Sequence, residues 1–385
     1  MYQLFLFDAL GDGKAQALRS TIAARVQELH LDPAAEFEFL GPGDLPRLKI
    51  EAVRVGVLLT NSSAGQAFAN EVKVLLDSPA VVIPAVVAVE DFHEKVPEVL
   101  RPTNALTLDK GDQDVEKLAG RVLELFGLLR KRRRLFISYK RTESSPAAQQ
   151  LYHVLDERSY DVFLDTLSVQ SGDDFQEQLW HRMSDADIVI LLYTPSIHTN
   201  RWTREEVQKA TGMKITVLQL IWPCMKRDPV TSGFEALYLC DDDFDRAHPG
   251  QLTAQKATQI AVLVEKLRAR SQANRQAELI GTLRERAEKH SLTTAVQPAR
   301  YVDVFKDETT FSRVIPTVGV PDSESFQTGT GALAPVLGKT PKQIVLLYES
   351  LTVAKAWRAH LDWLDGYLPV RTVKAVEVDQ WLANL

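Results

Sequence analysis

The chain has little cysteine and no long apolar run. Its 385 residues include only Cys224 and Cys240, too few for a disulfide framework, and no Cys-x-x-Cys or Cys/His cluster suggests zinc. The longest apolar run, residues 80–89, contains a proline and is too short to cross a bilayer. Residues 1–10 lack the basic start of a signal peptide. These absences predict a cytoplasmic protein with no membrane segment and no metal.

An excess of basic charge is also missing. The net charge is −6 overall, with −7 in residues 1–129, +1 in residues 130–270 and 0 in residues 271–385. A general nucleic-acid binder would need a basic field, which this distribution excludes. Cations are concentrated in the middle third, which suits an anionic small molecule. With 45% hydrophobic and 25% charged residues, the composition is that of a globular protein of two or three domains.

Three apolar runs predict strands that are buried on both faces, as in parallel sheets. They lie at residues 55–60, 188–194 and 344–348. Each is followed by a polar turn, a helical stretch near 65–76, 201–211 or 352–366, and another apolar strand. The pattern predicts a βαβ unit in each of three α/β domains. The predicted domains are 1–129, 130–270 and 271–385.

Elements before these runs extend the first two copies. Strands are expected at residues 4–7 and 135–138, helices near 14–30 and 145–158, and strands at 37–40 and 162–164. The third copy has apolar stretches at 301–305 and 311–320 but no clear first helix, and residues 328–342 are expected to form a loop. Closing helices are expected at 113–129 and 251–270, the second continuing or kinking through 272–290. The basic run 130–134 is expected to be a solvated domain joint.

Two strand ends in the middle domain carry polar residues. The segment Phe136-Ile-Ser-Tyr-Lys-Arg141 places Ser138, Lys140 and Arg141 at the carboxyl end of a strand, which is where ligands bind in open parallel sheets. The alternative is a solvated strand end. Asp165 ends the next strand and either faces a ligand or lies in an ordinary turn.

Trp202 and Glu206 form the third feature of the middle domain. They are four residues apart, so on a helix they share one face. An aromatic surface and a carboxylate would then flank one cleft. The alternative is a tryptophan in the core beside a glutamate on the surface.

These segments together resemble the TIR (Toll/interleukin-1 receptor) domain family over about residues 132–270. The resemblance rests on Phe136-Ile-Ser-Tyr-Lys-Arg141, Val162-Phe-Leu-Asp165 with Gly172, the strand from Ile188 to Leu192, and Trp202-x-x-x-Glu206. It implies a flavodoxin-like parallel sheet, flanked here by two further α/β domains. The amino-terminal domain resembles a degenerate copy, with Phe68 and Glu71 spaced by three residues instead of four.

The resemblance implies an NAD+ glycohydrolase of the kind that bacteria use in anti-phage defence. Glu206 matches the catalytic glutamate, Trp202 its aromatic partner, Asp165 the loop after the second strand, and Phe136, Lys140 and Arg141 the nucleotide-side first loop. Ser138, in the same strand, is grouped with these substrate-binding residues. NAD+ is then a substrate and no cofactor is expected.

This sequence departs from the family pattern in two places. Lys140-Arg141 stands where a double arginine is usual, and Asn200-Arg201 replaces a serine before the tryptophan. TIR enzymes generally assemble, so a homo-oligomer is implied, with an activating partner or a nucleotide signal as further options. Because many family members are non-enzymatic, a scaffold that only self-associates is the alternative function.

The chemistry of the reaction agrees with a single carboxylate. Nicotinamide leaves NAD+ as a neutral base, so its departure needs no general acid, unlike an ordinary glycoside. Glu206 can stabilise the developing oxocarbenium charge, and Lys140 and Arg141 can neutralise the diphosphate. Glu205 is adjacent, but at i+3 from Trp202 it points elsewhere.

Other motifs are rejected as sites. Gly338-Lys-Thr340 lacks the glycine that a phosphate loop needs five residues earlier. The acidic run 241–245 lacks the glycine and closing glutamate of a calcium loop. Trp357 and Trp363, six residues apart on one expected helix, predict a core or interface role.

Overall fold

The structure is a computed structural model of the chain. It describes residues 1–385 except 30, 50–51, 79, 89, 91, 167–172, 196–209, 213, 298–300, 308–310 and 332–339. The described chain divides into two units, residues 1–131 and 132–385.

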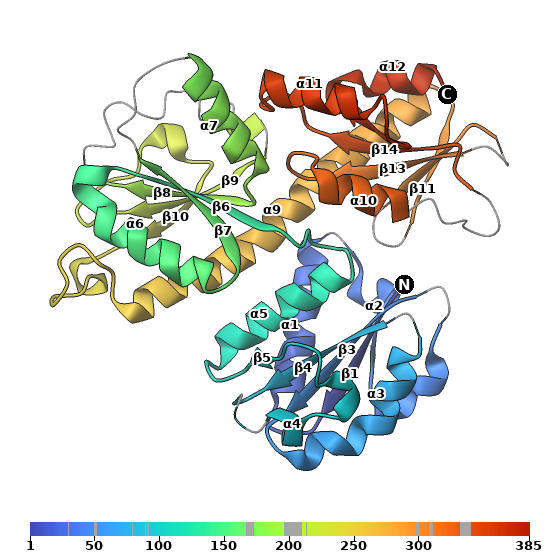
Figure 1. The fold of residues 1–385 in the computed structure, drawn as a ribbon. Helices are drawn as coiled ribbons and strands as arrows, with labels where there is room; N and C mark the ends of the chain where they lie inside the picture. The colour runs from blue at the N-terminus through green and yellow to red at the C-terminus, as the bar shows by residue number, and fades with distance from the viewer. Residues whose placement is uncertain are drawn as a thin grey trace. The chain divides into compact units, whose positions relative to one another are not determined.

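The first unit is built on a parallel sheet with strand order β2-β1-β3-β4-β5 (Figure 1). Its strands are β1 (Tyr2–Asp8), β2 (Phe37–Leu40), β3 (Val53–Thr60), β4 (Ala80–Val86) and β5 (Leu106–Thr107). Its helices are α1 (Lys14–Glu28), α2 (Pro33–Glu36), α3 (Ala69–Leu76), α4 (Phe92–Lys95) and α5 (Asp112–Leu125), with 3₁₀ turns η1 (Pro42–Arg47), η2 (Ser63–Phe68) and η3 (Glu98–Leu100).

The apolar run of β3 explains its central position. All its residues except the first are buried, because helices cover both faces of the sheet (Figure 1). Gly56 allows α3 to approach closely, since a Cβ atom there would lie 2.7 Å from Leu75 and 2.9 Å from Val82. The strand predicted at 55–60 is therefore confirmed.

The second unit begins with another parallel sheet, of strand order β10-β9-β8-β6-β7. Its strands are β6 (Arg133–Tyr139), β7 (Tyr160–Thr166), β8 (Ile188–Tyr193), β9 (Thr216–Ile221) and β10 (Glu235–Tyr238). The helices with it are α6 (Arg141–Asp156), α7 (Asp173–Asp185) and α9 (Ala254–Lys289), with 3₁₀ turns η5 (Pro229–Thr231) and η6 (Asp241–Asp243). In chain order the strands run 2-1-3-4-5, which is the flavodoxin-like arrangement.

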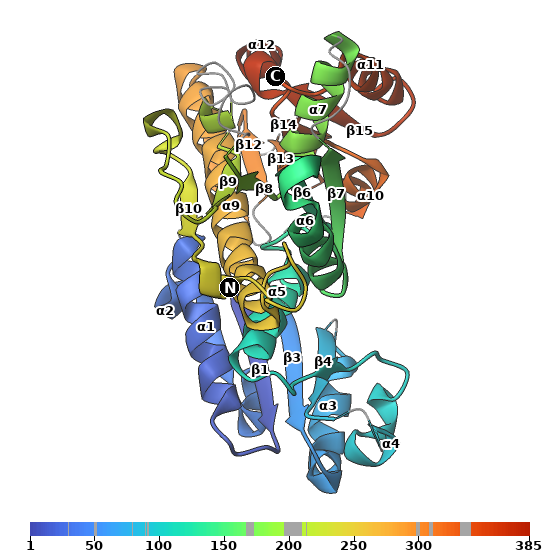
Figure 2. The same ribbon diagram turned by 90° about the vertical axis from the view of Figure 1, so that its left-hand side faces the viewer.

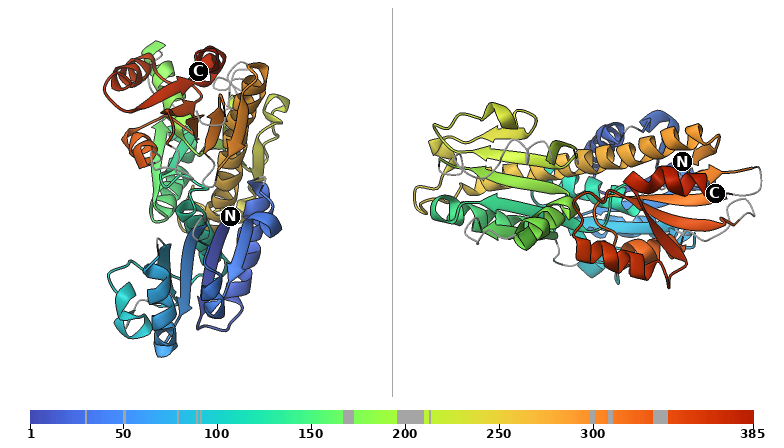
Figure 3. Two further views of the ribbon diagram at one scale, coloured as in Figure 1. Left: turned by 90° about the vertical axis from the view of Figure 1, so that its right-hand side faces the viewer. Right: turned by 90° about the horizontal axis from the view of Figure 1, so that it is seen from above.

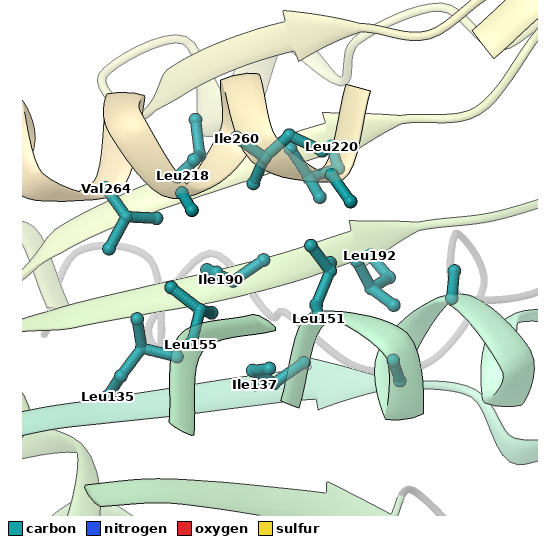
Figure 4. Close-up of a cluster of buried hydrophobic side chains, with 14 of the residues drawn as sticks. Leu135, Ile137, Leu151, Leu155, Ile190, Leu192, Leu218, Leu220, Ile260 and Val264 are labelled. Atoms are coloured by element: carbon teal, nitrogen blue, oxygen red, sulfur yellow. The ribbon is translucent and has the colours of Figure 1, made fainter. Parts of the chain in front are cut away.

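Two cores cover the two faces of this middle sheet. Alternating strand residues point to opposite faces, so Ile137 and Ile190 join the side chains of α6 and α9, whereas Phe136 and Val189 face α7. Figure 4 shows Leu151 and Leu155 of α6 directed toward the strands, with residues of α9 completing the layer. The sheet is therefore the middle layer of three.

A third sheet follows within the second unit and differs in topology. Its strands β11 (Thr293–Val296), β12 (Val302–Phe305), β13 (Phe311–Thr317), β14 (Gln343–Tyr348) and β15 (Val370–Lys374) lie in sequential order. The first three pair antiparallel and the last three parallel. Its helices are α10 (Ser323–Gly331), α11 (Lys355–Leu364) and α12 (Val378–Ala383), with η8 (Ala375–Glu377) before α12. A helix thus occupies residues 328–331, where the sequence predicted a loop.

Helix α9 belongs to both sheets of the second unit. Its 36 residues correspond to a length of about 54 Å at 1.5 Å per residue. Ile260 and Val264 pack on the middle sheet, and Leu279 and Leu283 pack on the third sheet. Figure 3 shows the helix running along both (right view). The predicted boundary between residues 270 and 271 falls inside this helix, and the division of the chain into three domains stays a prediction.

The basic run 130–134 contains the boundary between the two units, as predicted for a domain joint. Lys131 and Arg132 are exposed, but the prediction that the run is solvated is wrong for the next two arginines. Arg133 pairs with Glu265 and both side chains are buried. Arg134 pairs with Asp185 and Asp322. These carboxylates come from segments about 50 to 190 residues away in the sequence, so local patterning contained no sign of them.

Among the described helices, none combines the length and the apolar character needed to cross a bilayer.

Candidate functional site

The carboxyl edge of the middle sheet holds two buried hydroxyl groups. Ser138 lies next to the last residue of β6, and Thr194 directly follows β8. Both side chains are buried, and neither hydroxyl has a hydrogen-bond partner in the described part of the chain. Leaving such a group unpaired costs about 1–3 kcal/mol. Other buried polar atoms in the described chain also lack partners, among them the Tyr160 hydroxyl. What distinguishes Ser138 and Thr194 is their position at the carboxyl ends of parallel strands, so this edge is a candidate ligand site.

Two cations stand where β6 passes into α6. Lys140 is the N-cap of this helix and Arg141 is its first residue. The side chain of Lys140 makes no cap hydrogen bond to the helix, whereas the Ser144 hydroxyl donates to the Lys140 carbonyl at 3.2 Å. The backbone at Ser144 is not helical (φ −137°, ψ 17°), so a kink separates this first turn from the rest of α6. The two adjacent cations by themselves provide a favourable field for phosphate. The structure therefore brings Ser138, Lys140 and Arg141 to one sheet edge, as the sequence predicted.

Phe136 lies in a different environment from the other predicted residues. Its side chain is buried in the core that faces α7, together with Trp180 and Met183. Its ring stacks on that of Phe163, with centroids 5.4 Å apart. A packing role accounts for this position, and a role in substrate binding stays a prediction.

Three further predicted site residues, Asp165, Trp202 and Glu206, are described only in part or not at all. Asp165 is opposite Ser138 in the β6–β7 register, so its backbone lies at the same edge of the sheet. Its side chain is not among those that the structure describes. Trp202 and Glu206 lie in segment 196–209, outside the described residues. Their shared helix face and catalytic roles stay predictions.

A comparison with protein families identifies the segment that contains the middle sheet. The family model described as TIR domain matches residues 135–253, a range that begins in β6 and ends just before α9. This segment is a TIR domain. The match supports the resemblance found in the sequence, and it leaves the relationship of residues 1–129 to TIR domains as a prediction.

Other comparisons add no functional information. No curated protein matches the chain. Similar solved structures include tagatose-6-phosphate ketose/aldose isomerase from Escherichia coli, at 10% identity over 73% of this chain and 83% of that one, with a TM-score of 0.21. A candidate phosphosugar isomerase from Clostridium difficile matches at 8% identity over 71% and 84%, with a TM-score of 0.20. Overlaps this poor carry no argument.

The opposite edge of the TIR domain contains a buried polar cluster that sequence reasoning missed. Asp187 precedes β8 and is fully buried, as is Arg268 of α9, whose Nε donates to it at 3.0 Å. Gln272 donates at 2.7 Å and the backbone N–H of Arg134 at 3.2 Å to the same carboxylate. The cluster fixes α9 to the start of β8. In the sequence, the only indication of this cluster is that a single aspartate, Asp187, directly precedes a strongly apolar run.

A second contact missed from sequence joins the TIR domain to the third sheet. Glu177 of α7 accepts the backbone N–H of Lys355 at 2.6 Å, and His181 accepts that of Ala354 at 3.3 Å. Asp185 accepts the N–H of Val320 at 3.1 Å. The three acceptors are four residues apart, so they share one helix face.

Burial affects the protonation of this contact. It lowers the pKa of His181, against the attraction of nearby Asp185, and so favours the neutral ring, which can accept the Ala354 N–H. The ring also lies 6.0 Å from that of Trp357 on α11. Figures 1 and 2 show α7 and α11 side by side. Trp357 thus contacts the TIR domain, as expected from the predicted core or interface role, whereas Trp363 on the same helix is exposed.

Proposed function

We propose that the TIR domain is an NAD+ glycohydrolase that cleaves the nicotinamide–ribose bond and releases nicotinamide with ADP-ribose or a cyclic isomer. The observation that carries the proposal is the sequence Trp202-x-x-x-Glu206 within a matched TIR domain. NAD+ is an intracellular dinucleotide, so this activity fits the predicted cytoplasmic location.

The described sheet edge supports binding of a dinucleotide. Lys140 and Arg141 at the start of α6 suit a diphosphate. The buried hydroxyls of Ser138 and Thr194 have no partner among described residues, and a sugar or phosphate oxygen would satisfy either one. Both features lie at the carboxyl ends of parallel strands, where doubly wound sheets bind ligands.

The reaction requires little acid–base chemistry. The bond between ribose C1′ and the nicotinamide nitrogen breaks, and its electron pair leaves with the ring nitrogen, so that nicotinamide departs neutral. Glu206 stabilises the positive charge that develops on the ribose. Water adds to C1′ and loses a proton to solvent or to the carboxylate; in cyclisation an adenine nitrogen takes the place of water. Trp202 shapes the pocket around the leaving group.

The test is release of nicotinamide from NAD+ by the purified full chain, followed by chromatography. Replacing Glu206→Gln is expected to lower the rate by about 10³-fold, because the charge that stabilises the transition state is lost. The adjacent Glu205→Gln is the matched control and is expected to retain activity. Equal activity in all three proteins would show that the site is wrongly placed.

The alternative function is a non-enzymatic scaffold. If the unmodified chain releases no nicotinamide yet forms larger particles as its concentration rises, self-association is the function and the glycohydrolase proposal fails. We further propose a homo-oligomer through TIR–TIR contacts, because TIR enzymes generally complete their site by association. Light scattering with and without NAD+ measures this. An anti-phage role, which the resemblance implies, would show as loss of cellular NAD+ during infection.

A further inference from the structure

A cavity lies between the TIR domain and the helices of the third sheet. Its volume is about 770 Å³, within the range of small-molecule sites. Residues of α7 and the first part of β6 form one wall, and α10, α11 and the start of β15 form the other. Arg134 and Asp185 place it toward the amino ends of the TIR strands. It is therefore separate from the carboxyl edge where the proposed cleavage of NAD+ takes place.

One side of the cavity is apolar and aromatic. Phe326 of α10, Leu364 of α11 and Val370 of β15 supply apolar surface. The rings of Trp357 and His360 both line the cavity, with centroids 5.2 Å apart. The indole N–H of Trp357 donates to the Pro321 carbonyl at 3.2 Å, which fixes its orientation. The two ring planes are inclined by 53°, so a flat ring can stack on Trp357 while its edge meets His360.

The other side of the cavity is charged. Its lining includes three arginines and two aspartates, a formal excess of one positive charge. Arg134 pairs with Asp185 and Asp322, and Arg132 pairs with Asp322 and Glu324. These two guanidinium groups are therefore already neutralised.

Arg182 differs from the other two arginines. Its guanidinium lies over the ring of Phe163, 5.4 Å from the centroid. Within the described part of the chain it pairs with no carboxylate. A guanidinium in this state retains the capacity to bind an anion through two hydrogen bonds. The cavity thus combines an aromatic surface with one cation that has no carboxylate partner among the described residues.

We propose that this cavity binds a small aromatic anion, with its ring on Trp357 and His360 and its acidic group on Arg182. An uncharged aromatic ligand would make no contact that uses the charge of Arg182. A small inorganic anion would leave the apolar wall exposed to water. Because the walls come from the TIR domain and from the third sheet, such a ligand contacts both parts of the second unit.

The test uses adenosine monophosphate as the probe, with the full chain and isothermal titration calorimetry. Adenosine supplies the ring without the charge, and inorganic phosphate supplies the charge without the ring. We expect both to bind at least about tenfold more weakly than adenosine monophosphate, since each lacks one of the two contacts. Absence of binding at millimolar concentration, or equal binding of adenosine, would overturn the proposal.

Variants locate the binding. Arg182→Gln and His360→Ala are each expected to raise the Kd about tenfold. Their matched controls are Arg246→Gln and His153→Ala, which replace exposed residues outside the lining and should leave the Kd unchanged.

The proposed NAD+ site is tested in the same series. Arg141→Gln alters that site and should not affect binding in the cavity. Loss of binding in Arg141→Gln, with the Arg182 and His360 variants unaffected, would place the probe at the carboxyl edge and refute the cavity proposal. Neither result depends on whether NAD+ is cleaved.

Discussion

The sheet of the first unit and the sheet of the TIR domain have the same strand order and different carboxyl edges. In the first unit β1 ends at Asp8, whose carboxylate accepts the backbone N–H groups of Leu10 at 2.9 Å and Gly11 at 3.1 Å. The corresponding strand of the TIR domain, β6, continues into Lys140 and Arg141. The carboxylate at the edge of the first unit is thus bonded to nearby backbone N–H groups, whereas the edge of the TIR domain has two cationic residues. The shared strand order therefore places the carboxyl end of the first strand at the same edge in both sheets. The residues at that strand end decide whether the edge suits an anionic substrate.

The amino edges differ as well. Ala52 precedes β3 in the first unit and is buried, while Asp187 precedes β8 and forms the buried cluster with Arg268 and Gln272. The TIR sheet is thus tied by ionic contacts to α9. The equivalent place in the first unit is occupied by a small apolar side chain.

The largest expected effect separates the two sheets by activity. Glu206→Gln should remove nicotinamide release, whereas Glu71→Gln, at the related place in the first unit, should leave the rate within about twofold. Glu71 belongs to α3 and follows Phe68, the N-cap of that helix, by three residues, whereas Trp202 and Glu206 are four residues apart in the sequence. Loss of activity in Glu71→Gln would mean that the first unit also contributes to catalysis.

The next effect concerns stability. Asp187→Ala leaves the buried guanidinium of Arg268 without its carboxylate, so the free energy of unfolding of the second unit should fall by about 3–5 kcal/mol. Urea unfolding followed by circular dichroism measures it. Asp242→Ala removes an exposed pair with Arg246 and should cost under about 1 kcal/mol. A similar small loss for both would show that the cluster contributes little.

A smaller effect is expected at the starts of the first helices. Arg141→Gln should raise the KM for NAD+ about tenfold with little change in kcat, because a charge-assisted contact to the substrate is lost. Lys14 is the first residue of α1 and provides the matched control, since Lys14→Gln should change neither constant. Steady-state kinetics distinguishes the two. A fall in kcat alone for Arg141→Gln would contradict a binding role.

The smallest effect is a pH dependence of the contact between the TIR domain and the third sheet. Because the pKa of His181 is lowered by burial, the folded protein holds fewer protons there than the unfolded chain. Its contribution to stability is present above about pH 6.5 and is lost as the pH falls through the folded pKa.

Melting temperatures between pH 7.5 and 5 test this contribution. His181→Gln, whose amide oxygen accepts the Ala354 N–H without titrating, should flatten the dependence. His93→Gln, at an exposed position on α4, is the control in the first unit and should not. Identical pH profiles for the two variants would remove His181 from the explanation.

Regular elements were largely predictable from the sequence. The runs that form β3, β8 and β14 are continuous and apolar because parallel strands are covered on both faces. The third sheet was less predictable. Its first three strands pair antiparallel and α10 lies between β13 and β14, in a stretch whose glycine and threonine content favoured a loop. Packing of Phe326 against Val370 and its neighbours outweighs that local preference.

In the candidate site, too, some features could be predicted from the sequence and others could not. The positions of Ser138, Lys140 and Arg141 at a strand end followed from the strand pattern, because a strand's carboxyl end is fixed once its apolar run is known. That Ser138 is buried, with a hydroxyl that has no partner among the described residues, did not follow, since burial depends on neighbouring strands. Phe136 was placed in the same predicted set and lies on the same face of the strand as Ser138. It packs in the core because it is two residues further from the carboxyl end, where side chains of α7 cover the sheet.

By itself the sequence determined the α/β character of the chain, the TIR domain and the candidate catalytic motif, because these depend on short runs and fixed spacings. Only the tertiary structure decided the partners of the arginines at 132–134, the buried contact of Asp187 with α9, and the cavity bounded by α7 and α11. The physical reason is distance along the chain. Arg134 and Asp322 are 188 residues apart, so their pairing depends on how the sheets and α9 pack, and no local pattern encodes it.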